Sequence, residues 1–226
     1  MFLFHIVHKR LSRHPASRFY AWSRWLAIFL SVLVAMTAPL GAAEPAIKLM
    51  VFGDSLSAGY GLQKPNSFTE KLSKALQGQG LNVNVIAASV SGDTTAGGKA
   101  RLDWAMVDKP DAVLLELGAN DGLRGIEPAT SRANLADILR RLKSKGTRVL
   151  IAGMLAPPNL GKEYGAEFNQ IYTGLARHYK FPLYPFFLEG VAAMPHLNQK
   201  DGIHPNPQGV DEIVKRILPM VVKLVR

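Results

Sequence analysis

Short apolar runs alternate with longer amphipathic segments along residues 44–226, and this alternation limits the possible folds more than any other feature. The candidate strands are residues 47–52, 82–88, 111–117, 148–153 and, more weakly, 182–187. The candidate helices are residues 67–79, 96–107, 128–144, 164–179 and 208–225. Strands that are apolar throughout are buried on both faces, which is typical of a parallel sheet covered by helices. The sequence therefore predicts an α/β fold, a three-layer α/β/α sandwich with a parallel sheet of about five strands.

The first 43 residues have a different composition and predict a secretory signal peptide. Residues 1–24 contain five basic and no acidic residues, an apolar run follows at 25–36, and small residues stand at Gly41 and Ala43. This order is typical of a cleaved export signal, with cleavage expected after Ala43. The alternative is an uncleaved membrane anchor, but the apolar run of 12 residues is shorter than the roughly 20 that a span needs. We therefore expect a periplasmic or secreted protein with no stable membrane anchor.

Removal of residues 1–43 leaves 183 residues, which predict one domain, 44–226, large enough to fold without a disulfide or a structural metal. Five of the 27 basic residues and none of the 17 acidic ones lie in the signal peptide, so the net charge falls from +10 to +5. The remaining basic residues are not clustered with aromatic ones, which argues against a nucleic-acid partner. Cysteine is absent. We expect a monomer.

The stretch "GDSLSAGYG" (53–61) follows the first predicted strand directly. It does not match the phosphate-binding Walker pattern, which would need Gly and Lys at 58 and 59, nor the dinucleotide-binding glycine pattern. It also departs from the nucleophile elbow G-x-S-x-G, because position 57 is Ser. In a parallel sheet, ligands bind beyond the carboxyl ends of the strands. Ser55 is therefore a candidate nucleophile in a different sequence frame.

A serine nucleophile needs a base, and residues 44–226 contain three histidines. His178 falls in a predicted helix and His196 in an irregular segment, whereas His204 follows Asp201 by three positions, just before the last helix. An aspartate placed in this way can orient the imidazole toward the serine. The alternative is that Asp-x-x-His is only a turn or a cap, which is the commoner meaning of so short a pattern. Asp201 and His204 alone are too few ligands for a catalytic metal.

Two further glycine-containing segments follow predicted strands, residues 89–95 and 117–122. Gly92 can offer a backbone N–H, and Asn120 a side-chain amide, to the same edge of the sheet. With the N–H of Ser55 they would form a three-donor oxyanion hole. Each segment taken alone is equally consistent with a tight turn or an Asx cap.

Together these residues resemble the SGNH hydrolases, also called the GDSL esterase and lipase family. Its four name-giving positions are present here, in the family's order, as Ser55, Gly92, Asn120 and His204. The segments 116–125, 168–176, 182–187 and 201–209 are similar to the bacterial periplasmic group that includes arylesterase, thioesterase I and lysophospholipase L1. The resemblance implies a flavodoxin-like sandwich, no metal or organic cofactor, and cleavage of acyl esters and thioesters as small-molecule substrates.

Carried over by position, the resemblance makes Ser55 the nucleophile, His204 the base and Asp201 the carboxylate that orients it. Ser55, Gly92 and Asn120 would form the oxyanion hole. Asp54 is expected to hydrogen-bond the turn and not to act as a second catalytic acid. Leu123, Ile126, Leu155 and Pro157, in the loops after the third and fourth strands, are expected to line an apolar substrate channel. The alternative for these four residues is that they only pack the loops.

Two other functions remain open at this point. Members of the same family also remove acetyl groups from polysaccharide or peptidoglycan, and a strict preference for acetyl over octanoyl esters would indicate such an O-acetylesterase. A non-catalytic envelope binding module is the third hypothesis. A fluorophosphonate that labels Ser55 covalently would separate an enzyme from a binding module.

Overall fold

Five parallel strands form the central sheet in the order β2-β1-β3-β4-β5. The computed structural model describes residues 45–226, which form one compact unit; the predicted signal peptide and its cleavage site lie outside the described residues. The strands are β1 (Ile47–Gly53), β2 (Val83–Ala87), β3 (Ala112–Glu116), β4 (Arg148–Ala152) and β5 (Leu183–Tyr184). The α/β class and the parallel five-stranded sheet predicted from the sequence are confirmed.

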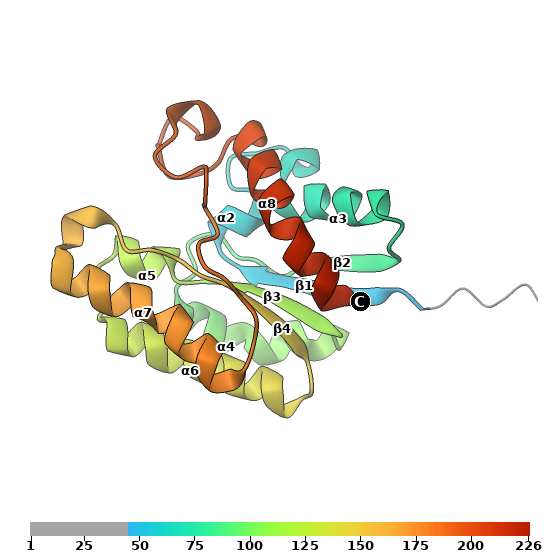
Figure 1. Cartoon of the computed structure of the whole chain (residues 1–226), viewed down its shortest axis with the longest axis horizontal. Coiled ribbons are helices and arrows are strands. Elements are labelled where there is room, and N and C mark those ends of the chain that lie inside the picture. The colour runs from blue at the N-terminus through green and yellow to red at the C-terminus, as the bar shows by residue number, and fades with distance from the viewer. Residues whose placement is uncertain (1–44) are drawn as a thin grey trace, which may run out of the picture. The chain divides into compact units, whose positions relative to one another are not determined.

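Two helices cover one face of the sheet and three cover the other (Figure 1). On one face lie α3 (Phe68–Gly78) and α8 (Pro207–Val225), and on the other α4 (Thr95–Ala105), α6 (Pro128–Ser144) and α7 (Lys162–Tyr179). Shorter helices are α2 (Ser55–Ala58), α5 (Ala119–Leu123), η1 (Lys64–Asn66), η2 (Met106–Asp108), η3 (Pro158–Leu160) and η4 (Pro195–Leu197). Because helices cover both faces, every residue of β3 is buried.

Most predicted element boundaries lie within two residues of the observed ones, and the largest difference is at the last strand. The sequence predicted a strand over 182–187, but β5 contains only Leu183 and Tyr184. Pro185 has no backbone N–H and cannot extend the ladder with β4. Gly153 instead donates to the carbonyl of Tyr184 and accepts from the N–H of Phe187, both at 2.8 Å, so the chain bends away from the sheet.

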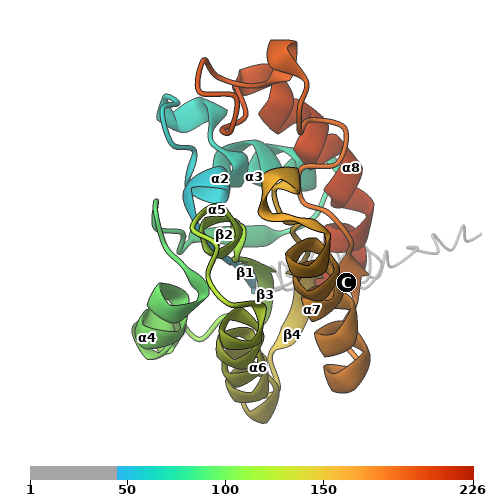
Figure 2. The same cartoon turned by 90° about the vertical axis from the view of Figure 1, so that its left-hand side faces the viewer.

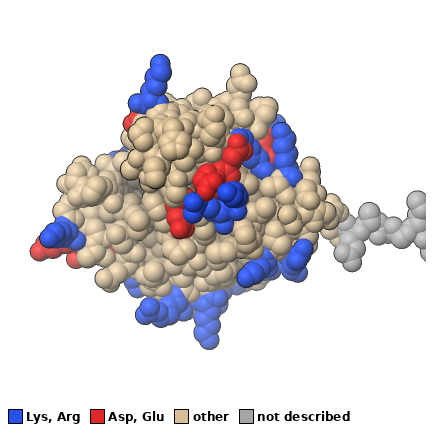
Figure 3. Space-filling model, turned by 45° about the horizontal axis from the view of Figure 1, so that its top comes forward, with Lys and Arg blue, Asp and Glu red and all other residues tan. Residues whose placement is uncertain are grey.

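The carboxyl ends of the strands meet at one edge, where α2 and α5 lie side by side in front of the sheet (Figure 2). On the face shown in Figure 3, basic side chains stand at separate places, several of them beside acidic ones. Among the ion pairs of the described residues are Lys71 with Asp211 and Arg216 with Glu212. Within residues 45–226, no helix has the length and apolar character needed to cross a bilayer.

Candidate active site

The segment that carries Ser55 is a single helical turn placed directly after β1. Asp54 caps this turn, because its Oδ1 accepts the N–H of Leu56 at 3.0 Å, and Gly59 ends it with a positive φ of 81°. Gly53 allows Ser57 to pack closely against the end of β1, because a Cβ at position 53 would lie 2.2 Å from Oγ of Ser57. Ser55 is the first residue of α2, where its N–H has no partner within the helix.

Ser55, His204 and Asp201 form one hydrogen-bonded chain of side chains. Nε2 of His204 lies 3.0 Å from Oγ of Ser55, and Nδ1 lies 2.7 Å from Oδ2 of Asp201. The other carboxylate oxygen of Asp201 accepts the N–H groups of His204 (3.0 Å) and Ile203 (2.9 Å). These backbone donors, followed by the imidazole, lower the pKa of Asp201 to about 2. The carboxylate is therefore ionised, and it fixes both the loop and the ring.

The loop that carries His204 is anchored on both sides. Asn206 caps α8 by accepting the N–H of Gly209, and Pro207 is the first residue of that helix, a position that proline favours. The carbonyl of His204 accepts the N–H of Gln199 at 2.7 Å. The ring of Tyr60 lies 4.6 Å from the imidazole, centroid to centroid. The imidazole is thus held from several directions.

The other two histidines are exposed and lie elsewhere. His178 is on the outer side of α7, next to Tyr179, and His196 is in η4. No hydrogen bond among the described residues joins either imidazole to Ser55. Of the three candidates, only His204 contacts the serine.

Gly92 lies in the loop after β2, and Asn120 lies in the first turn of α5, the short helix that follows β3. Both amide hydrogens of Asn120 are engaged: Nδ2 donates to the carbonyl of Asp93 at 2.9 Å and, over a longer 3.3 Å, to Oδ2 of Asp54. Gly92 has φ = 85°, and its carbonyl accepts from Arg124 at 3.0 Å. In the described part of the chain, no hydrogen bond engages the N–H of Ser55 or of Gly92. These two groups are free to donate to a ligand.

Sequence reasoning missed an acidic pair beneath the serine turn. Glu116, the last residue of β3, is fully buried; its Oε2 lies 2.7 Å from Oγ of Ser57 and accepts the N–H of Asp54 at 3.3 Å. Burial, and then the nearby Asp54 carboxylate, raises the pKa of Glu116 well above its usual value. Burial likewise raises the pKa of Asp54 to about 7. The one sequence signal was an acidic residue at the end of an otherwise apolar strand.

An apolar pocket of about 470 Å³ opens beside Ser55 and His204. Leu123, Leu155 and Pro157 line it, as the sequence interpretation expected, together with Met154, Phe186 and Leu188. Ile126 does not. Its N–H donates to the carbonyl of Asp121 and its carbonyl accepts from the hydroxyl of Tyr164 at 2.8 Å, so its backbone is held against α5 and α7. The pocket can take an apolar chain whose reactive end lies at Ser55.

Comparisons with known proteins indicate the same class of protein, a hydrolase of acyl esters. Residues 51–211 match the model of the GDSL-like Lipase/Acylhydrolase family. The chain is 43% identical over 183 residues to an arylesterase of Vibrio mimicus, covering 80% of this chain and 92% of that one. It is 38% identical over 203 residues to the thioesterase 1/protease 1/lysophospholipase L1 of Escherichia coli, covering 88% and 94%. The crystal structure of TesA superposes with a TM-score of 0.75 at 40% identity, covering 78% and 99%.

Proposed function

Because the chain belongs to the GDSL-like Lipase/Acylhydrolase family, we propose that it is a serine esterase that hydrolyses acyl esters and thioesters through an acyl-enzyme on Ser55. The observation that carries this proposal is the 3.0 Å contact between Oγ of Ser55 and Nε2 of His204 at the mouth of an apolar pocket. A hydroxyl in contact with an oriented imidazole has the base that a serine nucleophile needs.

In the first half of the reaction, Oγ of Ser55 attacks the carbonyl carbon while Nε2 of His204 takes the hydroxyl proton. Asp201 accepts a hydrogen bond from Nδ1–H of His204 and so stabilises the imidazolium. The bond to the leaving alcohol or thiol breaks, and that group receives the proton from Nε2. In the second half, His204 takes a proton from water, which attacks the acyl-enzyme, and the acid leaves as the proton returns to Ser55.

The negative oxygen of each tetrahedral intermediate needs donors, and we assign the N–H groups of Ser55 and Gly92 and the amide of Asn120 to this role. The support for the first two is that neither N–H is engaged in the described part of the chain. Asn120 would give up its longer, 3.3 Å contact with Asp54 and keep the 2.9 Å one with Asp93. Its amide would then be oriented by a backbone carbonyl, which does not titrate.

The substrate class follows from the pocket. Its walls are mainly Leu, Met, Pro, Ala and Phe, which favours an acyl chain of several carbons over acetyl alone. This argues against the O-acetylesterase alternative. The names of the two relatives, arylesterase and thioesterase 1/protease 1/lysophospholipase L1, support activity on both oxygen and sulfur esters.

We also propose that the enzyme acts after export, with residues 1–43 removed as a signal peptide, and that it has no lasting membrane anchor. The support is the order of basic, apolar and small residues in that segment. We propose a monomer because every assigned site residue comes from one chain, so that no partner is required to complete the site. Mass spectrometry of the exported protein and sedimentation test these two statements.

The central experiment is covalent labelling of residues 44–226 by a fluorophosphonate, combined with a panel of aryl esters, acyl-CoA thioesters and lysophospholipids. We expect wild type to be labelled at Ser55 and to turn over at least one of these classes. Ser55→Ala should lose both properties. The matched control is Ser57→Ala, which removes a hydroxyl from the same turn and should still be labelled. A folded wild-type protein that is neither labelled nor active would support the binding module instead.

A further inference from the structure

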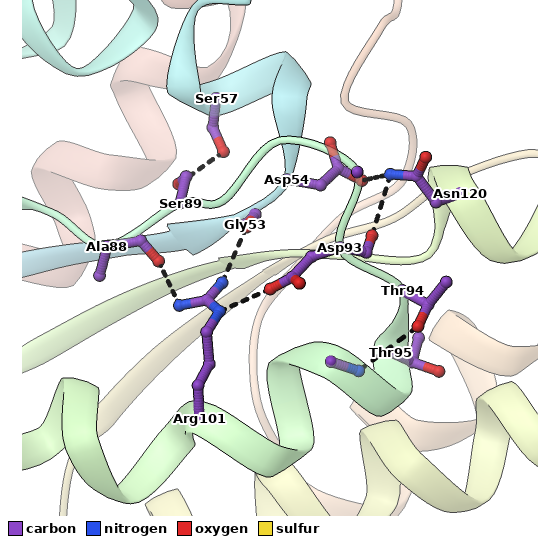
Figure 4. A network of polar contacts seen from close by, with 12 residues as sticks. Gly53, Asp54, Ser57, Ala88, Ser89, Asp93, Thr94, Thr95, Arg101 and Asn120 are labelled. Atoms are coloured by element: carbon purple, nitrogen blue, oxygen red, sulfur yellow. Dashed lines mark hydrogen bonds and ion pairs between the residues drawn. The ribbon is translucent and has the colours of Figure 1, made fainter.

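Arg101, on α4, connects the segments on which the proposed oxyanion donors lie (Figure 4). Its guanidinium donates to the carbonyl of Ala88 at 2.7 Å and to the carbonyl of Gly53 at 3.0 Å, and it pairs with the carboxylate of Asp93 at 2.5 Å. All three partners lie beyond or at the carboxyl end of a strand. One side chain therefore joins the ends of β1 and β2 to the loop that follows β2.

Two of these contacts, those with Gly53 and Asp93, lie close to proposed donors. Gly53 is the last residue of β1 and stands two positions before Ser55. Asp93 follows Gly92, and the carbonyl of Asp93 accepts the amide of Asn120 at 2.9 Å, so that the same residue contacts Arg101 through its side chain and Asn120 through its backbone (Figure 4). Arg101 thus reaches Gly92 and Asn120 through Asp93, and Ser55 through Gly53 and the following Asp54.

The guanidinium is well placed to hold these segments rigidly. The side chains of Arg101 and Asp93 are each 17% exposed, and the guanidinium carbon lies 4.0 Å from the centre of the Phe52 ring. A partly buried, charge-assisted bond is stronger than a neutral one at the surface. The flat guanidinium carries five N–H donors in a fixed arrangement, so it can serve three acceptors at once, which the single ammonium of lysine does less well.

We propose that Arg101 is a positioning residue of the oxyanion hole: it holds the Ser55 turn, the Gly92 loop and, through Asp93, the Asn120 amide in the arrangement that the tetrahedral intermediate requires. This inference depends on the proposed esterase function. Arg101 itself touches neither the substrate pocket nor the side chains of Ser55 and His204, so its effect is on where the donors stand and not on the chemistry of the base.

The test compares Arg101→Met, Arg101→Lys and Asp93→Asn with wild type on a soluble ester. Arg141→Met is the matched control. Arg141 is 20% exposed, pairs with Asp103 and donates to the carbonyl of Lys99 at 3.1 Å, so it is another ion-paired arginine that joins two helices, α6 and α4, but it contacts no segment of the site. Thermal melts of all variants separate a loss of folding from a loss of turnover.

Outright loss of an oxyanion donor typically lowers turnover by about 10²–10³-fold, and a displaced donor should cost less. We therefore expect kcat to fall about 10- to 100-fold in Arg101→Met and less in Arg101→Lys and Asp93→Asn, with KM within about threefold of wild type. Both halves of the reaction pass through an oxyanion, so kcat reports the effect whichever half is slower. Arg141→Met should lower the melting temperature and leave kcat within about twofold.

The double variant Arg101→Met/Asp93→Asn should be no slower than Arg101→Met, because the Asp93 side chain acts through its contact with Arg101, which Arg101→Met has already removed. A folded Arg101→Met protein with the kcat of Arg141→Met would overturn the proposal, as would a change confined to KM. If Arg101→Met does not fold, kcat of Asp93→Asn is compared with that of Arg141→Met instead, and an unchanged kcat in Asp93→Asn counts against the proposal. The failure of the esterase function is distinct: wild type would then hydrolyse no ester at all.

Discussion

Nε2 of His204 lies 3.0 Å from Oγ of Ser55, although 149 residues separate the two in the sequence. The parallel sheet makes this contact possible. Ser55 follows β1, which lies inside the sheet between β2 and β3, and His204 precedes α8, which packs on the face that α3 also covers. Because all strands point the same way, every loop after a strand reaches the edge where Ser55 stands.

Replacement of His204 by alanine tests whether this contact is catalytic. We expect kcat to fall by about 10³-fold or more, because the serine loses its base, with only a small change in melting temperature. His196→Ala is the control: that imidazole is exposed and lies in η4, ahead of the His204 loop, and its loss should leave kcat within about twofold. A His204→Ala protein that keeps a tenth of the wild-type rate would remove His204 from the mechanism.

Asp201→Asn tests the role of the carboxylate. The side chain keeps its size but loses the charge that stabilises the imidazolium, so we expect kcat to fall at least about 10²-fold. The pKa of Asp201 is lowered to about 2, so its contribution to the free energy of unfolding should be complete above pH 3.8 and be lost as the pH falls toward 2. Thermal melts from pH 2 to 6 should show this acid-dependent loss in wild type and less of it in Asp201→Asn. Equal melting curves at every pH would contradict it.

The order of elements and the nucleophile–base pair could be predicted from the sequence because they depend on local patterns. Apolar runs identified the strands, and the predicted helix at 208–225 placed His204 just before α8. The contact between Ser55 and His204 followed once both were assigned to one edge of a parallel sheet. No comparison with another protein is needed for that step.

The rest of the site depends on contacts between distant segments, which one sequence does not display. Ile126 has the apolar character expected of a pocket wall, yet the bonds to Asp121 and Tyr164 hold its backbone elsewhere. In the sequence Arg101 is one of two basic residues on a predicted helix, and only the fold brings it to the carbonyls of Gly53 and Ala88. The position of Ile126 depends on the conformation of its loop, and that of the Arg101 guanidinium on the path of a long side chain.

Glu116→Gln tests whether the buried acid beneath the serine turn is protonated. The hydroxyl of Ser57 lies near both Glu116 and, at 2.8 Å, Ser89, and it has a single proton to donate, so a neutral Glu116 supplies the second hydrogen. Since burial raises the pKa of Glu116, its contribution to stability should be complete below about pH 4.5 and decline as the pH rises through the higher folded-state value. Glutamine does not ionise, so the variant should gain stability relative to wild type between pH 5 and 8.

The matched control for this variant is Glu167→Gln, which neutralises an exposed carboxylate on α7. It should leave the pH dependence of unfolding unchanged. Denaturant melts at each pH measure both differences. The difference in unfolding free energy between Glu116→Gln and wild type should change from pH 5 to 8. If it stayed constant, Glu116 would not be protonated in the folded protein over that range, and our assignment of a neutral carboxyl group would be wrong.

Leu155→Ser tests whether the apolar pocket binds the acyl chain. Leu155 lines the pocket and is 45% exposed, so the substitution should leave the fold intact while removing part of one wall. Burying one leucine side chain contributes about 1.5–3 kcal/mol, and partial contact with a chain should contribute less. We expect kcat/KM for an octanoyl ester to fall about three- to tenfold and that for the acetyl ester to change by less than twofold. Val107→Ser, an exposed apolar residue outside the pocket, should alter neither, and equal losses on both esters in Leu155→Ser would mean that the acyl chain lies elsewhere.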